Sequence, residues 1–226
     1  YGLEHADSGT LFVRNERMRF SSAADAIASG MGMVHQHFTL VPAMTVAENI
    51  ALGVHGQLDL TSVARRVEEL SALTGFVLEA DARVETLSVG AQQRVEIAKA
   101  LVRAARILIL DEPTAVLAPG ESAELLRWVR SYADAGNAAI LITHKLREAL
   151  GIADEVTVLR RGRTVMTAKR EAVTAETLTS AMIGEELSQA PSGPVVEGSR
   201  PSSTSGPVFR ADRVTLVDAI GGVRVR

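Results

Sequence analysis

The sequence predicts an α/β fold that is built on a parallel β-sheet and carries an inserted helical subdomain. Two continuous apolar runs, at 107–110 and 138–142, are typical of strands covered on both faces of such a sheet. A helical pattern over 120–134 separates the two runs, and this strand–helix–strand order favours parallel pairing. A helical block at 45–102 interrupts the alternation and is therefore predicted to be the insertion.

The composition excludes several classes of protein. The chain has 226 residues, enough for one large domain or one and a half at about 150 residues per domain. Its net charge of −3 argues against a chain whose main task is to bind nucleic acid, since such chains carry a basic excess. The absence of cysteine excludes a disulfide scaffold, a thiolate zinc site and a cysteine nucleophile. We expect a globular protein with no nucleic-acid partner.

The first half of the chain contains two strand signals before its helical block. Residues 10–20 alternate like a strand, with a polar turn near Asn15. Residues 31–36 form a short apolar run of strand length. Thr45 and Glu48 have the spacing of a capping box, in which each side chain binds an amide at the start of a helix.

Two further helices are predicted in the helical block. The first begins near Ser62, ends at Gly75 and presents one apolar face, made by Val63, Val67, Leu70 and Leu73. The second begins near Ser88, and its apolar residues are Val95, Ala98, Leu101 and Val102. The later helix at 120–134 is predicted to turn Leu125, Leu126, Val129 and Tyr132 inward.

The last third of the chain contains a hairpin, a helix and a change of composition. Residues 156–159 and 164–166 alternate on either side of Arg161-Gly162, which is a hairpin signal. A helix is expected from 174 to about 187. Residues 188–207 are rich in proline and serine and are typical of a linker.

The strongest chemical signal is the pair Asp111-Glu112 at the end of the apolar run 107–110. Parallel sheets bind ligands at the carboxyl edge of their strands, which is where this pair is predicted to lie. One carboxylate can hold Mg²⁺, and the next can polarise an attacking water. On these two residues alone, a solvated turn after a strand is an equal alternative.

Two other strand-like runs end in polar residues. Gln36 closes the run at 31–36, and His144 follows the run at 139–143. We expect both side chains to converge with Asp111 and Glu112 at one edge of the sheet. Ser88 is a natural N-cap, and Gly90 permits close approach to a ligand, so this helix start can bind phosphate or can be a plain cap. It is expected to lie away from the sheet edge.

Read in order, Gln36 and three segments resemble the ATP-binding subunit of an ABC transporter. The segments are LSVGAQQRVEI (87–97), ILILDEPTAVL (107–117) and ITHKLREA (142–149). The resemblance implies a P-loop NTPase fold. The segment GMVHQHFTLVPAMTVAENIALG (32–53) is similar to the simple-sugar and nucleoside importers, in which two ATPase halves are fused in one polypeptide.

That branch implies a domain division. Residues 1–187 correspond to a first ATPase domain, with its helical subdomain at about 45–102. Residues 188–207 correspond to the connector. Residues 208–226, which open with a strand-like alternation at 208–218, correspond to the start of a second ATPase domain.

The resemblance also implies roles for residues in the strand-end site. Gln36 contacts Mg²⁺ and the attacking water and couples the site to the membrane subunit. Asp111 orients Mg²⁺, Glu112 is the general base, and His144 senses the γ-phosphate of ATP. This is the pattern of phosphoryl transfer, in which positioning and charge neutralisation supply most of the catalysis.

The signature segment and the partners follow from the same resemblance. Ser88, Gly90 and Gln92 are expected to cap the γ-phosphate of ATP held by a second ATPase half. The implied partners are the transmembrane subunits of a permease and, indirectly, an extracytoplasmic solute-binding protein. The protein is expected at the cytoplasmic face of the membrane. The stretch 36–49 is unusually apolar for a loop and is expected to contact the permease, with packing under the helical subdomain an equal alternative for Leu40 and Val41.

Three features depart from the family pattern. Val89 replaces a glycine that many relatives have, and Ala118 replaces an aspartate. No G-x-x-x-x-G-K-[ST] phosphate-binding loop occurs in the chain. We interpret Tyr1–Leu3 as the end of the helix that follows this loop, so the chain is expected to be a fragment that alone does not hydrolyse ATP.

Two alternatives remain open. A soluble ABC ATPase acting on ribosomes or DNA would need a basic arm or long heptads, and 188–207 has neither. A degenerate regulatory half without the phosphate-binding loop is the other. Glu112, His144 and the signature segment are all retained, which argues against this second alternative.

Overall fold

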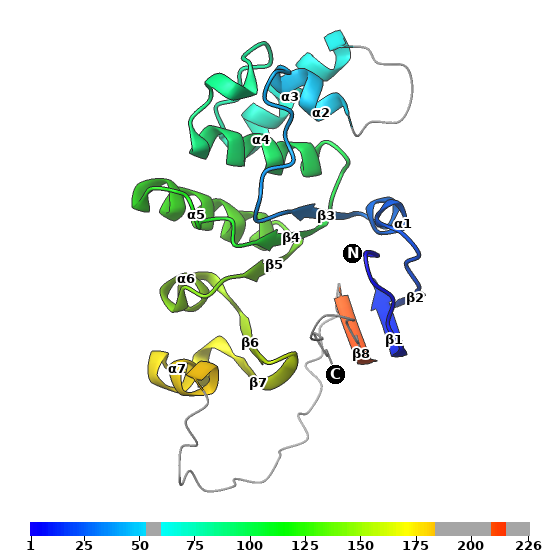
Figure 1. Ribbon diagram of the computed structural model, residues 1–226, viewed down its shortest axis with the longest axis vertical. Helices are drawn as coiled ribbons and strands as arrows, with labels where there is room; N and C mark the ends of the chain where they lie inside the picture. Colours follow the sequence, from blue (N-terminus) through cyan, green and yellow to red (C-terminus); the bar gives the residue numbers. More distant parts are fainter. Residues whose placement is uncertain (53–59, 184–208, 216–226) are drawn as a thin grey trace, which may run out of the picture. The chain divides into compact units, whose positions relative to one another are not determined.

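A computed structural model describes residues 1–52, 60–183 and 209–215 of the chain, and it confirms an α/β fold with a parallel sheet (Figure 1). The chain divides into two compact units. The first comprises Tyr1–Leu3 and Ser22–His144, and the second comprises Glu4–Ser21 and the chain from Lys145 onward. All residues of the predicted site belong to the first unit.

The sheet of the first unit has three parallel strands in the order β3-β4-β5. These are β3 (Met31–Val34), β4 (Ile107–Asp111) and β5 (Ala138–Ile142). The central strand β4 is the most deeply buried, with Ile107, Leu108 and Leu110 fully enclosed. Strand β5 has the apolar composition of an internal strand, but among the described residues it pairs only with β4, and it is half-buried along most of its length. The prediction that β5 is covered on both faces is therefore wrong.

Two helices accompany these strands. Helix α5 (Pro119–Asp134) connects β4 to β5, and it buries Leu125 and Val129 as predicted, whereas Leu126 and Tyr132 are only half-buried. Helix α1 (Ala23–Ala28) precedes β3 and was not predicted. It begins at a capping box between Ser22 and Asp25. Six residues give fewer than two helical turns, so no apolar period can be recognised in them.

The helical subdomain contains α2 (Val46–Ala51), α3 (Leu60–Thr74), the 3₁₀ turn η1 (Val84–Thr86) and α4 (Val89–Leu101). The capping box at Thr45 is confirmed, because Thr45 Oγ1 accepts from the Glu48 amide and Glu48 Oε2 accepts from the Thr45 amide. One apolar cluster joins the three helices and consists of Val46, Ala47, Ile50, Ala51, Val63, Val67, Leu70, Val95 and Ala98.

Helix α3 ends as predicted but buries one residue fewer. Gly75 follows it with a φ of 73°, the left-handed conformation that glycine adopts without steric cost. Leu73 is 82% exposed, so its assignment to the buried face is wrong. Leu73 lies in the last turn of a 15-residue helix, and α2, which packs against α3, has only six residues to cover it.

The second unit begins with a hairpin between β1 (Ser8–Val13) and β2 (Glu16–Met18), whose turn at Arg14-Asn15 has positive φ at both residues. Strand β8 (Phe209–Thr215) pairs antiparallel with β1. The predicted strand at 208–218 is thus present over 209–215. Its assignment to a second ATPase domain stays a prediction, and the predicted linker at 188–207 lies outside the described residues.

The rest of the second unit is a hairpin with two helices. Strands β6 (Glu155–Arg160) and β7 (Arg163–Lys169) meet at Arg161-Gly162, where φ is 50° and 70°, which confirms the predicted turn. Helix α6 (Leu146–Ile152) and the 3₁₀ turn η2 (Arg170–Ala172) were not predicted. Helix α7 (Ala175–Ile183) confirms the described part of the helix expected at 174–187.

The first residues of the chain are not helical. Tyr1–Leu3 have irregular backbone, with a φ of 86° at Gly2, and Leu3 is 65% exposed. Their interpretation as the end of a helix stays a prediction. Across the described parts of the chain, no helix is both long and apolar enough to cross a membrane.

Candidate functional site

The register of the sheet brings the predicted strand-end residues to one edge. Val34 of β3 pairs with Leu110 of β4, and Asp111 of β4 pairs with Ile142 of β5. Gln36 and His144 each follow their strand by two residues, and Glu112 follows β4 directly. The ends of three adjacent strands therefore place all four polar residues at the carboxyl edge of the sheet, as expected.

Glu112 and His144 are in direct contact. His144 Nδ1 lies 2.7 Å from Glu112 Oε1, a hydrogen bond between two neighbouring strand ends. The Glu112 side chain is only 16% exposed, whereas that of His144 is 68% exposed. Glu112 is thus held inside the edge of the sheet and His144 reaches outward from it, so a ligand at this edge can meet the imidazole.

The backbone of Glu112 explains how its side chain reaches His144. Its φ is 48°, in the left-handed region, which costs a non-glycine residue about 1–2 kcal/mol. The Glu112 amide donates to the carbonyl of Ile142 at 2.9 Å, which ties the turn to β5. Pro113 follows and disfavours a right-handed helical conformation at Glu112. Nothing in the residue type of Glu112 signals this conformation from sequence.

The second carboxylate oxygen of Glu112 is uncommitted. Glu112 Oε2 is buried and accepts no hydrogen bond from the part of the chain that the structure describes. A buried carboxylate oxygen without a partner is costly, and such atoms cluster at functional sites. This oxygen is available to accept a proton from a water or a hydroxyl group, while Oε1 is engaged by His144.

Asp111 and Gln36 both carry side-chain oxygens at the same edge of the sheet. Asp111 ends β4 and is half-buried, and Gln36 is exposed. Mg²⁺ takes oxygen ligands and is usually held by one or two carboxylates together with waters and substrate phosphates. The described residues contain no group of three or more histidine, cysteine, aspartate or glutamate side chains that could cage a metal. The donor set fits an ion that a phosphate ligand completes.

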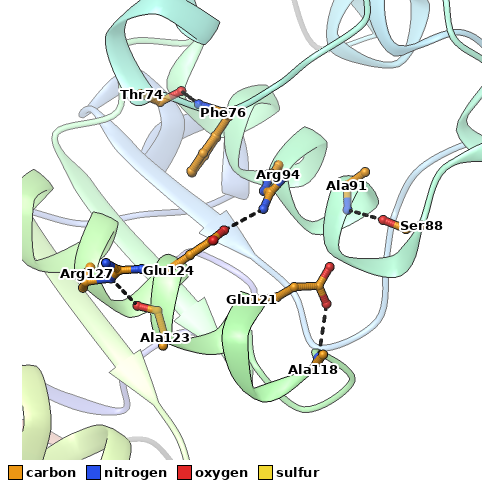
Figure 2. A network of polar contacts seen from close by, with 10 residues as sticks. All are labelled: Thr74, Phe76, Ser88, Ala91, Arg94, Ala118, Glu121, Ala123, Glu124 and Arg127. Carbon is orange, nitrogen blue, oxygen red and sulfur yellow. Dashed lines mark hydrogen bonds and ion pairs between the residues drawn. The ribbon is translucent and has the colours of Figure 1, made fainter.

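The signature residues lie on the helical subdomain. Ser88 is the N-cap of α4, and its Oγ accepts from the Ala91 amide at 3.2 Å (Figure 2). The side-chain amide of Gln92 donates to the Leu87 carbonyl at 3.1 Å and so stabilises the helix start. The hydrogen bonds of Ser88 stay within its own helix, and those of Glu112 reach β5. No hydrogen bond between described residues joins Ser88 to Glu112, and the expectation that Ser88 lies away from the strand-end site stays a prediction.

Gly90 is in close contact with the helix that follows the acidic strand. A Cβ atom at Gly90 would lie 2.1 Å from Glu121 Oε1, so the carboxylate of Glu121 occupies the space of a missing side chain. Glu121 Oε2 accepts from the Ala118 amide at 3.1 Å, and this bond caps α5 (Figure 2). An ion pair of 3.0 Å between Arg94 and Glu124 joins α4 to α5 a turn further on.

Sequence reasoning missed Glu121 and its neighbours. The signal was available in part, because Glu121 stands three residues after Ala118, the spacing of a capping box. Ala118 has no side-chain acceptor, so only half of the box forms. An aspartate at this position would complete it.

Comparisons with known proteins show which family the chain resembles. Residues 1–115 match the ABC transporter family. The nucleoside import ATP-binding protein NupA of Lactococcus lactis is 44% identical over 83% of this chain and 38% of its own length. The ribose import ATP-binding protein RbsA of Chelativorans is 37% identical over 92% of this chain and 40% of its own length. The chain thus spans about two fifths of the length of these curated relatives.

The fold of the chain is also similar to that of a solved ABC transporter component. The structure of cbiO1 from Clostridium perfringens, described as part of the ABC transporter complex cbiONQ, has 28% sequence identity to the chain and superimposes with a TM-score of 0.65. The match covers 79% of this chain and 72% of cbiO1. With strand-end acids, a capped signature helix and a family match over half its length, the chain belongs to the ABC transporter family.

Proposed function

We propose that the chain is part of an ATP-binding and ATP-hydrolysing subunit that energises the import of a simple sugar or a nucleoside. The observation that carries this proposal is the 2.7 Å contact between Glu112 and His144, with a second glutamate oxygen left free beside it. The names of the relatives, which are import proteins for nucleosides and ribose, indicate the class of solute.

The strand-end residues have distinct roles in this proposal. Glu112 accepts a proton from the attacking water through its free Oε2, and its Oε1 keeps His144 in place for the γ-phosphate. Asp111 and Gln36 hold Mg²⁺, which neutralises charge on the phosphates when it is bound. Positioning and charge compensation, rather than a covalent intermediate, then supply the rate enhancement.

The signature helix supplies the other side of a shared site. Ser88 is exposed at the N-terminus of α4, where unpaired amides and the helix dipole favour an anion. Within the described parts of the chain, no hydrogen bond joins Ser88 to Glu112, which supports the proposal that this helix start serves ATP bound by a second ATPase half. Gln92 stabilises the turn, whereas the carboxylate of Glu121 fills the space beside Gly90 and would have to move before a phosphate could approach that backbone.

Transport requires a membrane partner at the cytoplasmic face of the membrane. We propose that residues 36–49 contact the transmembrane subunits of the permease. A solute-binding protein delivers the solute to these subunits from the other side of the membrane. Val41 is 38% exposed, which suits a docking surface, and Phe38 and Met44 are half-buried. Leu40 packs on the apolar cluster of the helical subdomain, so it supports the loop from inside.

Hydrolysis is tested by the Glu112→Gln substitution in the complete gene product that contains this chain. Nucleotide binding should remain, and steady-state phosphate release should fall by roughly 10²- to 10⁴-fold, the usual contribution of a positioned general base. Glu155→Gln is the control, because Glu155 is exposed on β6 in the other unit. An unchanged rate in the Glu112 variant would assign the base role to another residue.

The 226-residue chain alone should bind Mg-ATP only weakly. It contains no G-x-x-x-x-G-K-[ST] loop to surround the β- and γ-phosphates with amides and a lysine. The carboxylates of Asp111 and Glu112 repel a triphosphate unless a cation lies between the carboxylates and the phosphates. Isothermal titration with Mg-ATP measures this directly, and micromolar binding with turnover would contradict it.

A further inference from the structure

The loop that follows Gln36 is fastened to the helical subdomain. Asn49 of α2 is fully buried, and its side chain binds both the amide of Val41, at 2.7 Å, and the carbonyl of Val41, at 3.0 Å. The carbonyl of Met44 accepts from the amide of Val84 in η1 at 3.0 Å. The loop is thus held by the segment of chain that leads into the signature helix.

A second attachment reaches the signature helix itself. Thr39 lies three residues after Gln36, and both its amide and its hydroxyl donate to the carboxylate of Glu96 on α4. Thr39 Oγ1 lies 2.9 Å from Glu96 Oε1. Lys99, one turn further along α4, donates to Thr39 Oγ1 at 3.0 Å and to its carbonyl at 3.3 Å. Thr39 is therefore bound by two charged side chains from one face of α4.

The burial of Glu96 indicates that this contact serves more than stability. Glu96 is 4% exposed and stands between Val95 and Ile97, which are also buried. A buried carboxylate loses its hydration, and an apolar residue of similar volume often stabilises a fold at least as well. What Glu96 adds is a fixed, directional attachment to Thr39, which an apolar side chain would not provide.

We propose that Glu96 and Lys99 are positioning residues that couple the signature helix to Gln36 through Thr39. Ser88 and Glu96 are eight residues apart on one helix, about 12 Å along its axis, so α4 acts as a rigid link between them. A shift of α4 when Ser88 binds phosphate then moves Thr39 and, with it, Gln36. This inference rests on the proposed ATPase function and adds a connection within it.

The test uses Thr39→Val and Thr39→Ser in the complete gene product, assembled with its partners. Thr39→Val keeps the volume but loses the hydroxyl, and we expect kcat for ATP to fall by about 10- to 100-fold, as for a misplaced catalytic group, with KM nearly unchanged. Thr39→Ser should restore most of the rate. In a Gln36→Ala background, Thr39→Val should have no further effect, because it acts through Gln36.

A matched control separates coupling from folding. Thr74→Val removes a hydroxyl that likewise makes two hydrogen bonds in the helical subdomain, to the Leu70 carbonyl and from the Phe76 amide, and it should leave kcat unchanged. An unaltered kcat in Thr39→Val, or an additive loss on top of Gln36→Ala, would overturn the inference. If the wild-type protein hydrolyses no ATP, the proposed function itself fails. This result differs from the two mutant outcomes that would overturn only the coupling.

Discussion

The contact between Gly90 and Glu121 leads to a quantitative prediction. In Gly90→Ala the new Cβ would lie 2.1 Å from Glu121 Oε1, so the carboxylate must move away and release the Ala118 amide. Losing this cap costs about 1 kcal/mol. Alanine in place of glycine in a helix returns up to about 1 kcal/mol. The two terms nearly cancel, and we expect the free energy of unfolding to change by less than about 1 kcal/mol.

The same substitution should behave differently when Glu121 is absent. In a Glu121→Ala background the cap is already lost and no clash remains, so Gly90→Ala should stabilise by up to about 1 kcal/mol. A double-mutant cycle measured by urea unfolding should therefore show a coupling energy near 1 kcal/mol between the two positions. Zero coupling, or a loss above about 3 kcal/mol in the single variant, would refute this account of the contact.

Three further outcomes are expected. Gly32→Ala should destabilise by about 1–3 kcal/mol, measured by urea unfolding, because its Cβ would lie 3.0 Å from the Cβ atoms of Ala100 and Ala105, and a stabilised variant would contradict this. Ala118→Asp should raise the free energy of unfolding by about 0.5–2 kcal/mol, since the carboxylate would complete the cap of α5; an unchanged thermal midpoint would count against it. Burial raises the pKa of Tyr132 to about 12, so the folded protein keeps the phenol proton that the unfolded chain loses near pH 10. Stability should then fall between pH 10 and about 12, and Tyr132→Phe should flatten that part of the pH profile.

The features that could be predicted from the sequence are those encoded by neighbouring residues. The apolar run of β4 is hydrophobic on both faces, and it is the most buried strand of its sheet. The capping box at Thr45 and Glu48 spans four residues and forms as expected. A strand–helix–strand unit joins two parallel strands, so their carboxyl ends lie at the same edge of the sheet. This predicts that Glu112 and His144 share that edge.

The features that were missed depend on distant residues or on short elements. Thr39 and Glu96 are 57 positions apart, and no local pattern relates them. The close approach of Gly90 to Glu121 depends on how α4 and α5 pack, which periodicity cannot specify. Helix α6 has only seven residues, so its apolar period is too short to recognise.

Strand β5 has the composition of an internal strand but lies at the end of its three-stranded sheet. It is apolar along its whole length, it pairs with β4 alone among the strands that the structure describes, and Ile142 is 46% exposed. An apolar strand with an unpaired edge is a template for association with another chain. The 226-residue chain should therefore aggregate through β5, and Ile142→Lys should slow aggregation, since charge on an edge strand opposes pairing. Leu73→Lys, at a more exposed leucine on α3, removes similar apolar surface without touching the edge. Light scattering at equal protein concentration compares the two variants, and equal protection by both would show that general surface hydrophobicity, not the edge of β5, drives association.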